Sequence, residues 1–190
     1  MTRPWPAVVR GELRGARRVA VLGIGNPDRG DDGAGPASVR ALRKGLRGRS
    51  SSVRLLEAGP VPESFTGPLR RFVPSHVVLV DAVRAGRKPG AVFLVDPASI
   101  GHDDLSSHRA PLSWLIRYLA QTTGCRVLLL GVQPGRTEPG EPLSAVVRKS
   151  VERVAAGLAH ILAAVPPPAR ERRTTTRAGK RLRPVRSSSA

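Results

Sequence analysis

Apolar and polar residues follow two patterns that alternate along the middle of the chain. Short apolar runs, typical of strands buried in a sheet, occur at 19–25, 53–59, 76–83, 91–96 and 125–132. Between or after them lie segments in which apolar residues recur every three or four positions, as in amphipathic helices: 34–46, 62–72, a stretch beginning near Pro111, and 143–162. This alternation predicts an α/β fold, a three-layer sandwich with a mostly parallel five-stranded sheet flanked by helices.

One strand of this sheet is expected to be antiparallel. The runs 76–83 and 91–96 are joined only by RAGRKPG, residues 84–90, which is too short for a crossover helix. We therefore expect these two strands to be antiparallel neighbours. The last helix has the clearest buried face, and prolines 166–168 should end it; the face consists of Leu143, Val146, Val147, Val151, Val154, Leu158, Ile161 and Leu162.

Charge and composition change toward both ends of the chain. The net charge is +18, of which residues 166–190 carry +7 and residues 1–18 carry +4. The C-terminal segment is poor in apolar residues and rich in Pro, Ser, Thr and Arg, so it cannot bury enough surface to offset its ordering entropy. We expect a basic, irregular N-terminal arm at 1–17, one domain at 18–165, and a disordered basic tail at 166–190.

Several classes of protein are excluded by simple counts. The single cysteine, Cys125, allows no intramolecular disulfide and no Cys-rich zinc site, and its apolar surroundings predict a buried, inert thiol. No run approaches the roughly 18 to 20 apolar residues of a membrane span, and the N-terminus has no apolar core of a signal peptide. We expect a cytoplasmic protein that does not associate with membranes.

Polar side chains gather where the predicted strands end. In an open α/β sheet, ligands bind beyond the carboxyl ends of the strands, so these positions are the candidate site. In chain order they are Asn26, Asp28, Asp31 and Asp32 after the first strand, Asp81 at the end of the third, His108 before the helix near Pro111, and Gln133 after the fifth.

The glycine-rich segment GIGNPDRGDDGAG, residues 23–35, does not fit a nucleotide. A dinucleotide loop needs a third glycine where this chain has Asp28, and three carboxylates would repel a phosphate. There is no P-loop GK[ST], no H-E-x-x-H and no G-x-S-x-G. Two carboxylates and an imidazole, in contrast, suit a divalent metal ion with positions left for water or substrate.

Each candidate also has an ordinary structural explanation. Asp81 could pair with Arg84 or with backbone amides, and His108 could be a solvated loop residue. Asp31 and Asp32 could simply be favourable charges before a helix N-terminus. The convergence of these residues on one rim favours the metal site. The remaining histidines are expected to lie on the surface or away from the rim: His76, His102 and His160.

Five segments together resemble the hydrogenase maturation endopeptidases, which trim the C-terminus of the large subunit of [NiFe] hydrogenases. They are GIGNPDRGDDGAGP, VLVDAV, KPGAVFLVDP, SSHRAPLSWLI and LLLGVQP, in matching order between about residue 18 and residue 163. The branch serving formate-hydrogenlyase-type hydrogenases is the most similar, because it also has GDDGAGP and an H-x-x-P-L helix start. One segment departs: Glu57-Ala58-Gly59 stands where the family usually has D-G-G.

The resemblance implies a site and a substrate. It places metal ligands at Asp32, Asp81 and His108, with Asp32 and Asp81 as the catalytic carboxylates of a metal-dependent, aspartic-type endopeptidase. The partner is the precursor of the large subunit, which supplies the nickel, and the cut follows a basic residue downstream of the metal-binding cysteines. The family also implies a monomer.

The chemical role of the metal stays open at this stage, and so do other functions. The metal could polarise the scissile carbonyl, or it could serve for recognition only while a carboxylate acts as general base. A non-catalytic nickel-dependent chaperone or scaffold, or a related peptidase with another substrate, would carry the same residues. The basic ends could bind nucleic acid, but the domain has no helix-turn-helix, zinc-finger or RNP signature, so we expect no such function.

Overall fold

The computed structural model describes residues 3–46, 51–96 and 112–167, and within them it confirms the predicted α/β fold. The elements are, in chain order, α1 Trp5–Glu12, β1 Val19–Ile24, the 3-10 helix η1 Gly30–Gly33, α2 Ala34–Gly45, β2 Val53–Gly59, the 3-10 helix η2 Pro62–Phe65, α3 Thr66–Phe72, β3 His76–Ala82, β4 Val92–Val95, α4 Leu112–Thr123, β5 Arg126–Val132 and α5 Ala145–Leu162.

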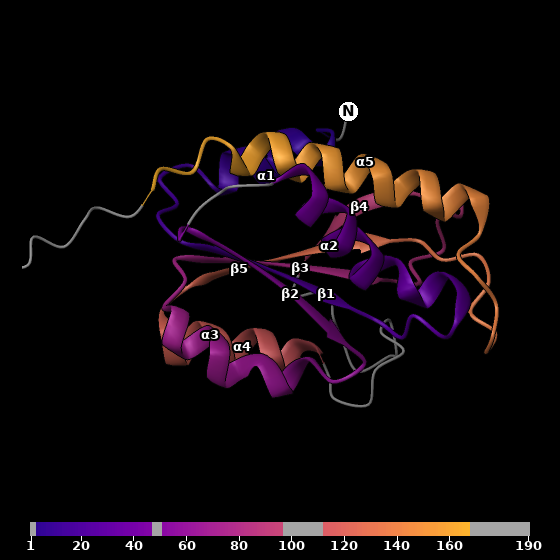
Figure 1. The fold of residues 1–190 in the computed structure, drawn as a ribbon, viewed down its shortest axis with the longest axis horizontal. Helices are drawn as coiled ribbons and strands as arrows, with labels where there is room; N and C mark the ends of the chain where they lie inside the picture. The colour runs from indigo at the N-terminus through magenta and orange to yellow at the C-terminus, as the bar shows by residue number, and fades with distance from the viewer. Residues whose placement is uncertain (1–2, 47–50, 97–111, 168–190) are drawn as a thin grey trace, which may run out of the picture.

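The sheet has the order β2-β1-β3-β5-β4 (Figure 1). β1 pairs in parallel with both β2 and β3, β3 pairs in parallel with β5, and β4 pairs antiparallel with β5. The prediction of one antiparallel strand is therefore confirmed, but its expected neighbour is wrong, because β5 lies between β3 and β4.

The connection after β3 explains this difference. It passes over the end of β5 and bonds to it on both sides: Val83 N–H donates to Val132 O at 2.9 Å, and Gly90 N–H donates to Gln133 O at 2.8 Å. Residues 84–90 are long enough for this, because skipping one strand requires only about 10 Å. The interior position in the sheet suits β5, because the second half of β5 is buried. The edge position suits β4, which is short and only half-buried.

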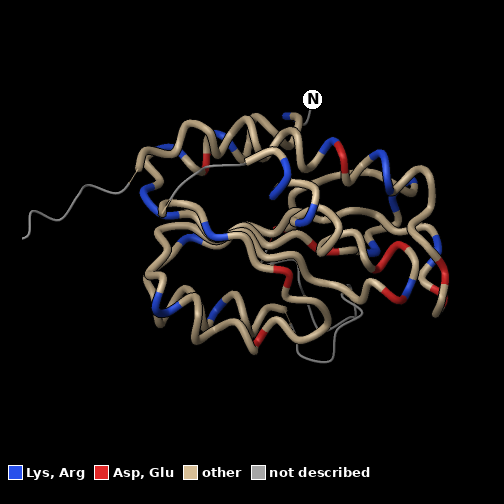
Figure 2. Tube along the Cα trace, viewed as in Figure 1, with Lys and Arg blue, Asp and Glu red and all other residues tan. Residues whose placement is uncertain are grey.

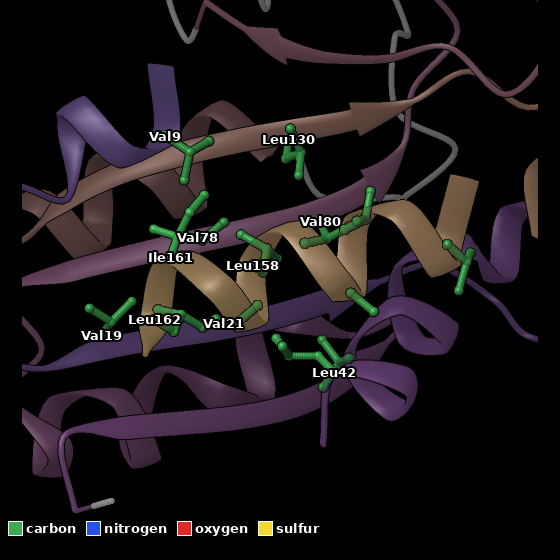
Figure 3. Close-up of a cluster of buried hydrophobic side chains, with 14 of the residues drawn as sticks. Val9, Val19, Val21, Leu42, Val78, Val80, Leu130, Leu158, Ile161 and Leu162 are labelled. Carbon is green, nitrogen blue, oxygen red and sulfur yellow. The ribbon is translucent and has the colours of Figure 1, made fainter. Parts of the chain in front are cut away.

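Helices cover both faces of the sheet (Figure 1). α1, α2 and α5 lie on one face, and α3 and α4 lie on the other. Figure 3 shows the larger apolar core, in which Leu158, Ile161 and Leu162 of α5 meet Val78 and Leu130 of the sheet. Because β1 and β3 are buried on both faces, their sequences are continuous apolar runs and not alternating ones.

The N-terminal segment was expected to be irregular, and this prediction is wrong, because the segment contains α1. Pro4 and Pro6 suit the first turn of a helix, and Val9 is fully buried against the core of α5. Trp5 packs on Gly157 of α5, where a Cβ atom would lie 2.6 Å from the indole ring. Eight residues give too weak a periodic signal to predict this helix, whose apolar face is completed by tertiary contact.

The last helix begins two residues later than predicted. Ser144 caps it by accepting a hydrogen bond from Val147 N–H, so Leu143 lies before the helix, and Val146 is 45% exposed. It ends at Leu162, before the prolines. The other residues predicted for its face are buried. Pro111 and the tail from residue 168 lie outside the described residues.

Cys125 and the described histidines can be placed directly. Cys125 is buried, as predicted, and burial raises the pKa of its thiol. His76 is also buried, at the start of β3 and so away from the rim, as predicted; desolvation, with the nearby Arg126, lowers its pKa. His160 is exposed in the last turn of α5. None of the helices in the described part of the chain is long and apolar enough to cross a membrane.

One non-glycine residue of the described chain has a positive φ. Val73 ends α3 with φ 49° and ψ 63°, a left-handed conformation that a β-branched side chain adopts only under strain. Its side chain is 57% exposed, so packing offsets little of this cost. The position is one at which helices commonly use glycine.

We expect Val73→Gly to stabilise the protein by about 0.5 to 1 kcal/mol, because the gain from relieving a left-handed valine exceeds the extra unfolded-state entropy of glycine. Denaturant unfolding of the wild type and the variant measures this. Val73→Ala is the control: it shortens the side chain but keeps Cβ, so it should recover much less. A glycine variant no more stable than the alanine variant would contradict the strain at this position.

Candidate active site

The candidate site lies at the rim formed by the carboxyl ends of three adjacent parallel strands. β1, β3 and β5 are neighbours in the sheet, and Gly23, Val80 and Leu130 stand at the same level in their registers. The loops that follow these strands therefore leave the sheet side by side. Figure 1 shows this rim at the right of the molecule, where α5 begins.

Glycines bring the first loop into direct contact with the strand ends. A Cβ at Gly35, in the first turn of α2, would lie 2.1 Å from Ile24 O and 2.3 Å from Val80 O. A Cβ at Gly25, where φ is +127°, would lie 1.9 Å from Asp32 O. Only glycine allows both approaches. The backbone of η1, which carries Asp32, is consequently held against the ends of β1 and β3.

Two of the predicted ligands are buried carboxylates at this rim. Asp32 is 3% exposed and lies in η1, and its Oδ2 accepts a hydrogen bond from Asn26 N–H at 2.7 Å. Asp81 is fully buried near the end of β3, and its Oδ1 accepts from Ala82 N–H at 2.8 Å. η1 contacts β3, so residues from two different strand-end loops meet here. Burying a carboxylate is costly unless a cation or hydrogen bonds compensate.

The third predicted ligand, His108, lies outside the described residues, as does His102. Within residues 3–46, 51–96 and 112–167, no group of three or more His, Cys, Asp or Glu side chains is arranged to hold a metal ion. The structure therefore places Asp32 and Asp81 at one rim, and the three-ligand site stays a prediction.

Asp31 has a role that its sequence context did not suggest. The sequence allows it to be simply a favourable charge before a helix N-terminus, but in the structure it is fully buried. Its carboxylate accepts four hydrogen bonds: from the N–H groups of Gly135, Arg136 and Ser144 at 2.8, 3.0 and 2.7 Å, and from the Ser144 hydroxyl at 3.0 Å. All four donors belong to the connection between β5 and α5.

We call residues 135–144 the strap. Besides the bonds to the Asp31 side chain, backbone bonds join it to the first loop: Asp31 N–H donates to Arg136 O at 2.8 Å, and Gly140 N–H donates to Asp28 O at 2.8 Å. Burial alone would raise the pKa of Asp31, but the bonds from Arg136, Ser144 and Gly135 outweigh it, and the net pKa is lowered. No local signal reveals this role, because the partners lie more than a hundred residues away in the chain.

Gln133 and Glu57 also serve the structure around the rim. Gln133 is buried, and its Oε1 accepts from Ala85 N–H at 2.8 Å and Arg87 N–H at 3.1 Å, which shapes the loop after β3. Glu57 is desolvated, but ion pairs with Arg43 and Arg40 of α2 lower its pKa below the usual value. The departure from D-G-G thus joins β2 to α2, and Gly59 O still accepts from Gly25 N–H at 3.0 Å.

We expect Asp31→Asn to destabilise the protein by about 1 to 3 kcal/mol at neutral pH. The amide oxygen can accept only some of the four hydrogen bonds, and the amide NH₂ group would face N–H or O–H donors of the strap. The ionised form is favoured in the folded state, so the stabilisation by Asp31 is present above its unfolded pKa of about 3.8 and is lost as the pH falls through the lower folded value. Denaturant unfolding over a pH series measures both effects.

Asp28→Asn is the matched control, because Asp28 is exposed on the same loop and, among the described residues, its side chain accepts no hydrogen bond from the strap. An Asp31→Asn protein as stable as this control, or a stability difference that does not shrink in acid, would contradict the assigned role.

Comparison with known proteins gives the site a context. A sequence model of the HycI family, described as hydrogenase maturation protease, matches residues 37–161. The hydrogenase 3 maturation protease of Escherichia coli is 30% identical over 135 residues, which cover 70% of this chain and 84% of that protein.

Solved structures agree with the sequence matches. The [NiFe] hydrogenase maturation protease HycI from Thermococcus kodakarensis superposes with a TM-score of 0.76 at 34% identity, covering 82% of this chain and 99% of that one. The hydrogenase maturating endopeptidase HybD from E. coli gives a TM-score of 0.64 at 25% identity, covering 77% and 92%. By its sequence and by its fold, the chain belongs to the hydrogenase maturation protease family.

Proposed function

We propose that the protein is an endopeptidase that removes a C-terminal peptide from the nickel-loaded precursor of a [NiFe] hydrogenase large subunit, and that it recognises the metal through Asp32, Asp81 and His108. Membership of the family supports a peptidase of hydrogenase maturation. The observation that supports metal recognition is the burial of two carboxylates, Asp32 and Asp81, at one rim of the sheet. As further proposals, the protein acts as a monomer in the cytoplasm.

The donor set fits a divalent first-row metal ion. Carboxylate oxygens and an imidazole nitrogen are ligands that nickel accepts, and the site has no thiolate that would favour a softer ion. Asp32 and Asp81 each accept a hydrogen bond from a backbone N–H, which orients the carboxylate. The nickel belongs to the substrate in this proposal, so the carboxylates recognise a precursor that already holds its metal.

The same carboxylates provide the acid–base chemistry of peptide hydrolysis. One of them, as general base, takes the proton of the water that attacks the scissile carbonyl, and the proton then passes to the leaving amine. General-base catalysis by a positioned carboxylate contributes about 100-fold to 10,000-fold. Recognition and hydrolysis would therefore both fail when either carboxylate is neutralised.

The test is a processing assay on the large-subunit precursor of the source organism, prepared with and without nickel, with loss of the C-terminal peptide followed by mass spectrometry. We expect cleavage of the nickel-loaded form only. Asp32→Asn, Asp81→Asn and His108→Gln should each reduce the rate by about 100-fold or more. Asp28→Asn, on the same loop but exposed, should cleave like the wild type.

Three outcomes would overturn the proposal. Equal cleavage of nickel-free precursor would remove the metal recognition. Full activity of the Asp32, Asp81 or His108 variants would remove those residues from the site. Nickel-dependent complex formation without cleavage would replace the peptidase by a non-catalytic chaperone or scaffold.

A further inference from the structure

Two guanidinium groups from different rim loops converge on one residue of the strap. Arg29, in the loop after β1, donates from Nε to Thr137 O at 3.4 Å. Arg84, in the loop after β3, donates from Nη2 to Thr137 Oγ1 at 2.5 Å. We propose that Arg29, Arg84 and Thr137 form an anion subsite that binds a carboxylate group of the substrate beside the scissile bond. This inference rests on the proposed function.

The strap gives this cluster a rigid frame. Thr137 follows directly on Arg136, whose N–H is held by the buried Asp31 carboxylate at 3.0 Å and whose carbonyl accepts from Asp31 N–H at 2.8 Å. A Cβ at Gly30 would lie 2.7 Å from Arg136 O, so the strap and the first loop are in close backbone contact. The two arginines therefore meet a positioned hydroxyl and not a loose loop.

The electrostatic situation of the two arginines is unusual for this rim, where basic and acidic positions are interleaved (Figure 2). In the part of the chain that the structure describes, Arg136 forms an ion pair with Glu141 at 3.6 Å, and Arg87 lies 4.4 Å from the centre of the Phe93 ring. Arg29 and Arg84 form no ion pair with a carboxylate among the described residues, although both are exposed.

An anion would relieve the cost of bringing these like charges together. A planar guanidinium matches a carboxylate with two parallel N–H bonds, and such charge-assisted bonds are about twice as strong as neutral ones. Each arginine uses one donor group on Thr137, and a guanidinium has five N–H donors, so both retain several for a ligand. The Thr137 hydroxyl, which accepts from Arg84, can donate to the same ligand.

Both arginines are close along the backbone to the two carboxylates of the candidate active site. Arg29 O accepts from Asp32 N–H at 3.0 Å, which places both in one turn of backbone. Arg84 follows three residues after Asp81 at the end of β3. A peptide bound across the carboxylates would pass these guanidiniums, which would attract its anionic groups. The ligand carboxylate has two possible sources, an acidic side chain of the precursor's C-terminal peptide or the terminal carboxylate itself.

The experiment compares Arg29→Ala, Arg84→Ala and the double variant with the wild type. Arg70→Ala is the matched control, because Arg70 is an exposed arginine in the last turn of α3, which precedes β3 and therefore lies at the opposite end of the sheet. Three nickel-loaded precursors are used: the natural one, one with the acidic residues of the released peptide changed to their amides, and one with a C-terminal amide. KM, kcat and the Kd of complex formation are measured for each pair.

We expect the double variant to raise KM and Kd for the natural precursor about tenfold with little change in kcat, and Arg84→Lys to recover only part of the loss. One of the two altered precursors should bind the wild type about as weakly as the natural precursor binds the double variant. The affinity of that altered precursor should be the same for the wild type and for the double variant. Which one does so identifies the source of the carboxylate.

The inference is overturned if KM and Kd of the double variant stay within about twofold of the wild type, or if they rise equally for all three precursors. The inference is also overturned if the double variant loses folding stability and kcat while KM and Kd stay unchanged, because the arginines would then only support the structure of the strap. The Kd measurement keeps the two proposals apart: arginine-dependent binding without any cleavage by the wild type would refute the peptidase and retain the anion subsite.

Discussion

The functional end of this molecule depends on the buried carboxylate of Asp31. Water is replaced around it by four donors, three backbone N–H groups and the Ser144 hydroxyl, all from the strap. A carboxylate with so many donors stays ionised despite burial, and removing it would leave several buried donors unpaired. The interaction joins loops that begin at β1 and β5, on either side of β3. Asp32 directly follows Asp31, and Thr137 directly follows Arg136, so this contact contributes to the position of both, together with the glycine contacts and the backbone bonds of the strap.

In the proposed function, the rim of the α/β sheet receives a cation. Nucleotide-binding proteins of α/β architecture present glycine amides and a helix N-terminus to a phosphate. This chain packs glycines against its own strand ends and has buried carboxylates at the rim. The glycines are needed for the close approach of η1 and α2 to β1 and β3, and the approach in turn buries Asp32. Burial makes an ionised pair of carboxylates expensive alone and favourable with a divalent ion.

Local patterns were sufficient to predict the strands, α2 and the position of Asp32 and Asp81, because periodicity and the rule of strand ends depend on neighbouring residues. Features that depend on distant contacts could not be predicted. The place of β5 between β3 and β4 depends on hydrogen bonds between the end of β5 and both ends of the segment that joins β3 to β4. The helix α1 depends on the packing of Val9 and Trp5 against α5. The burial of Asp31 follows from donors more than a hundred residues away. The contribution of His108 stays a prediction from resemblance.

The central claim is that Asp32 and Asp81 contact the nickel of the precursor. The most direct measurement is the nickel K-edge X-ray absorption spectrum of the nickel-loaded precursor, alone and freeze-trapped in complex with this protein. We expect the complex to add oxygen or nitrogen ligands to the nickel, and a complex with the Asp81→Asn variant to lack part of that change. A nickel environment identical in the free precursor and in the wild-type complex would contradict the account.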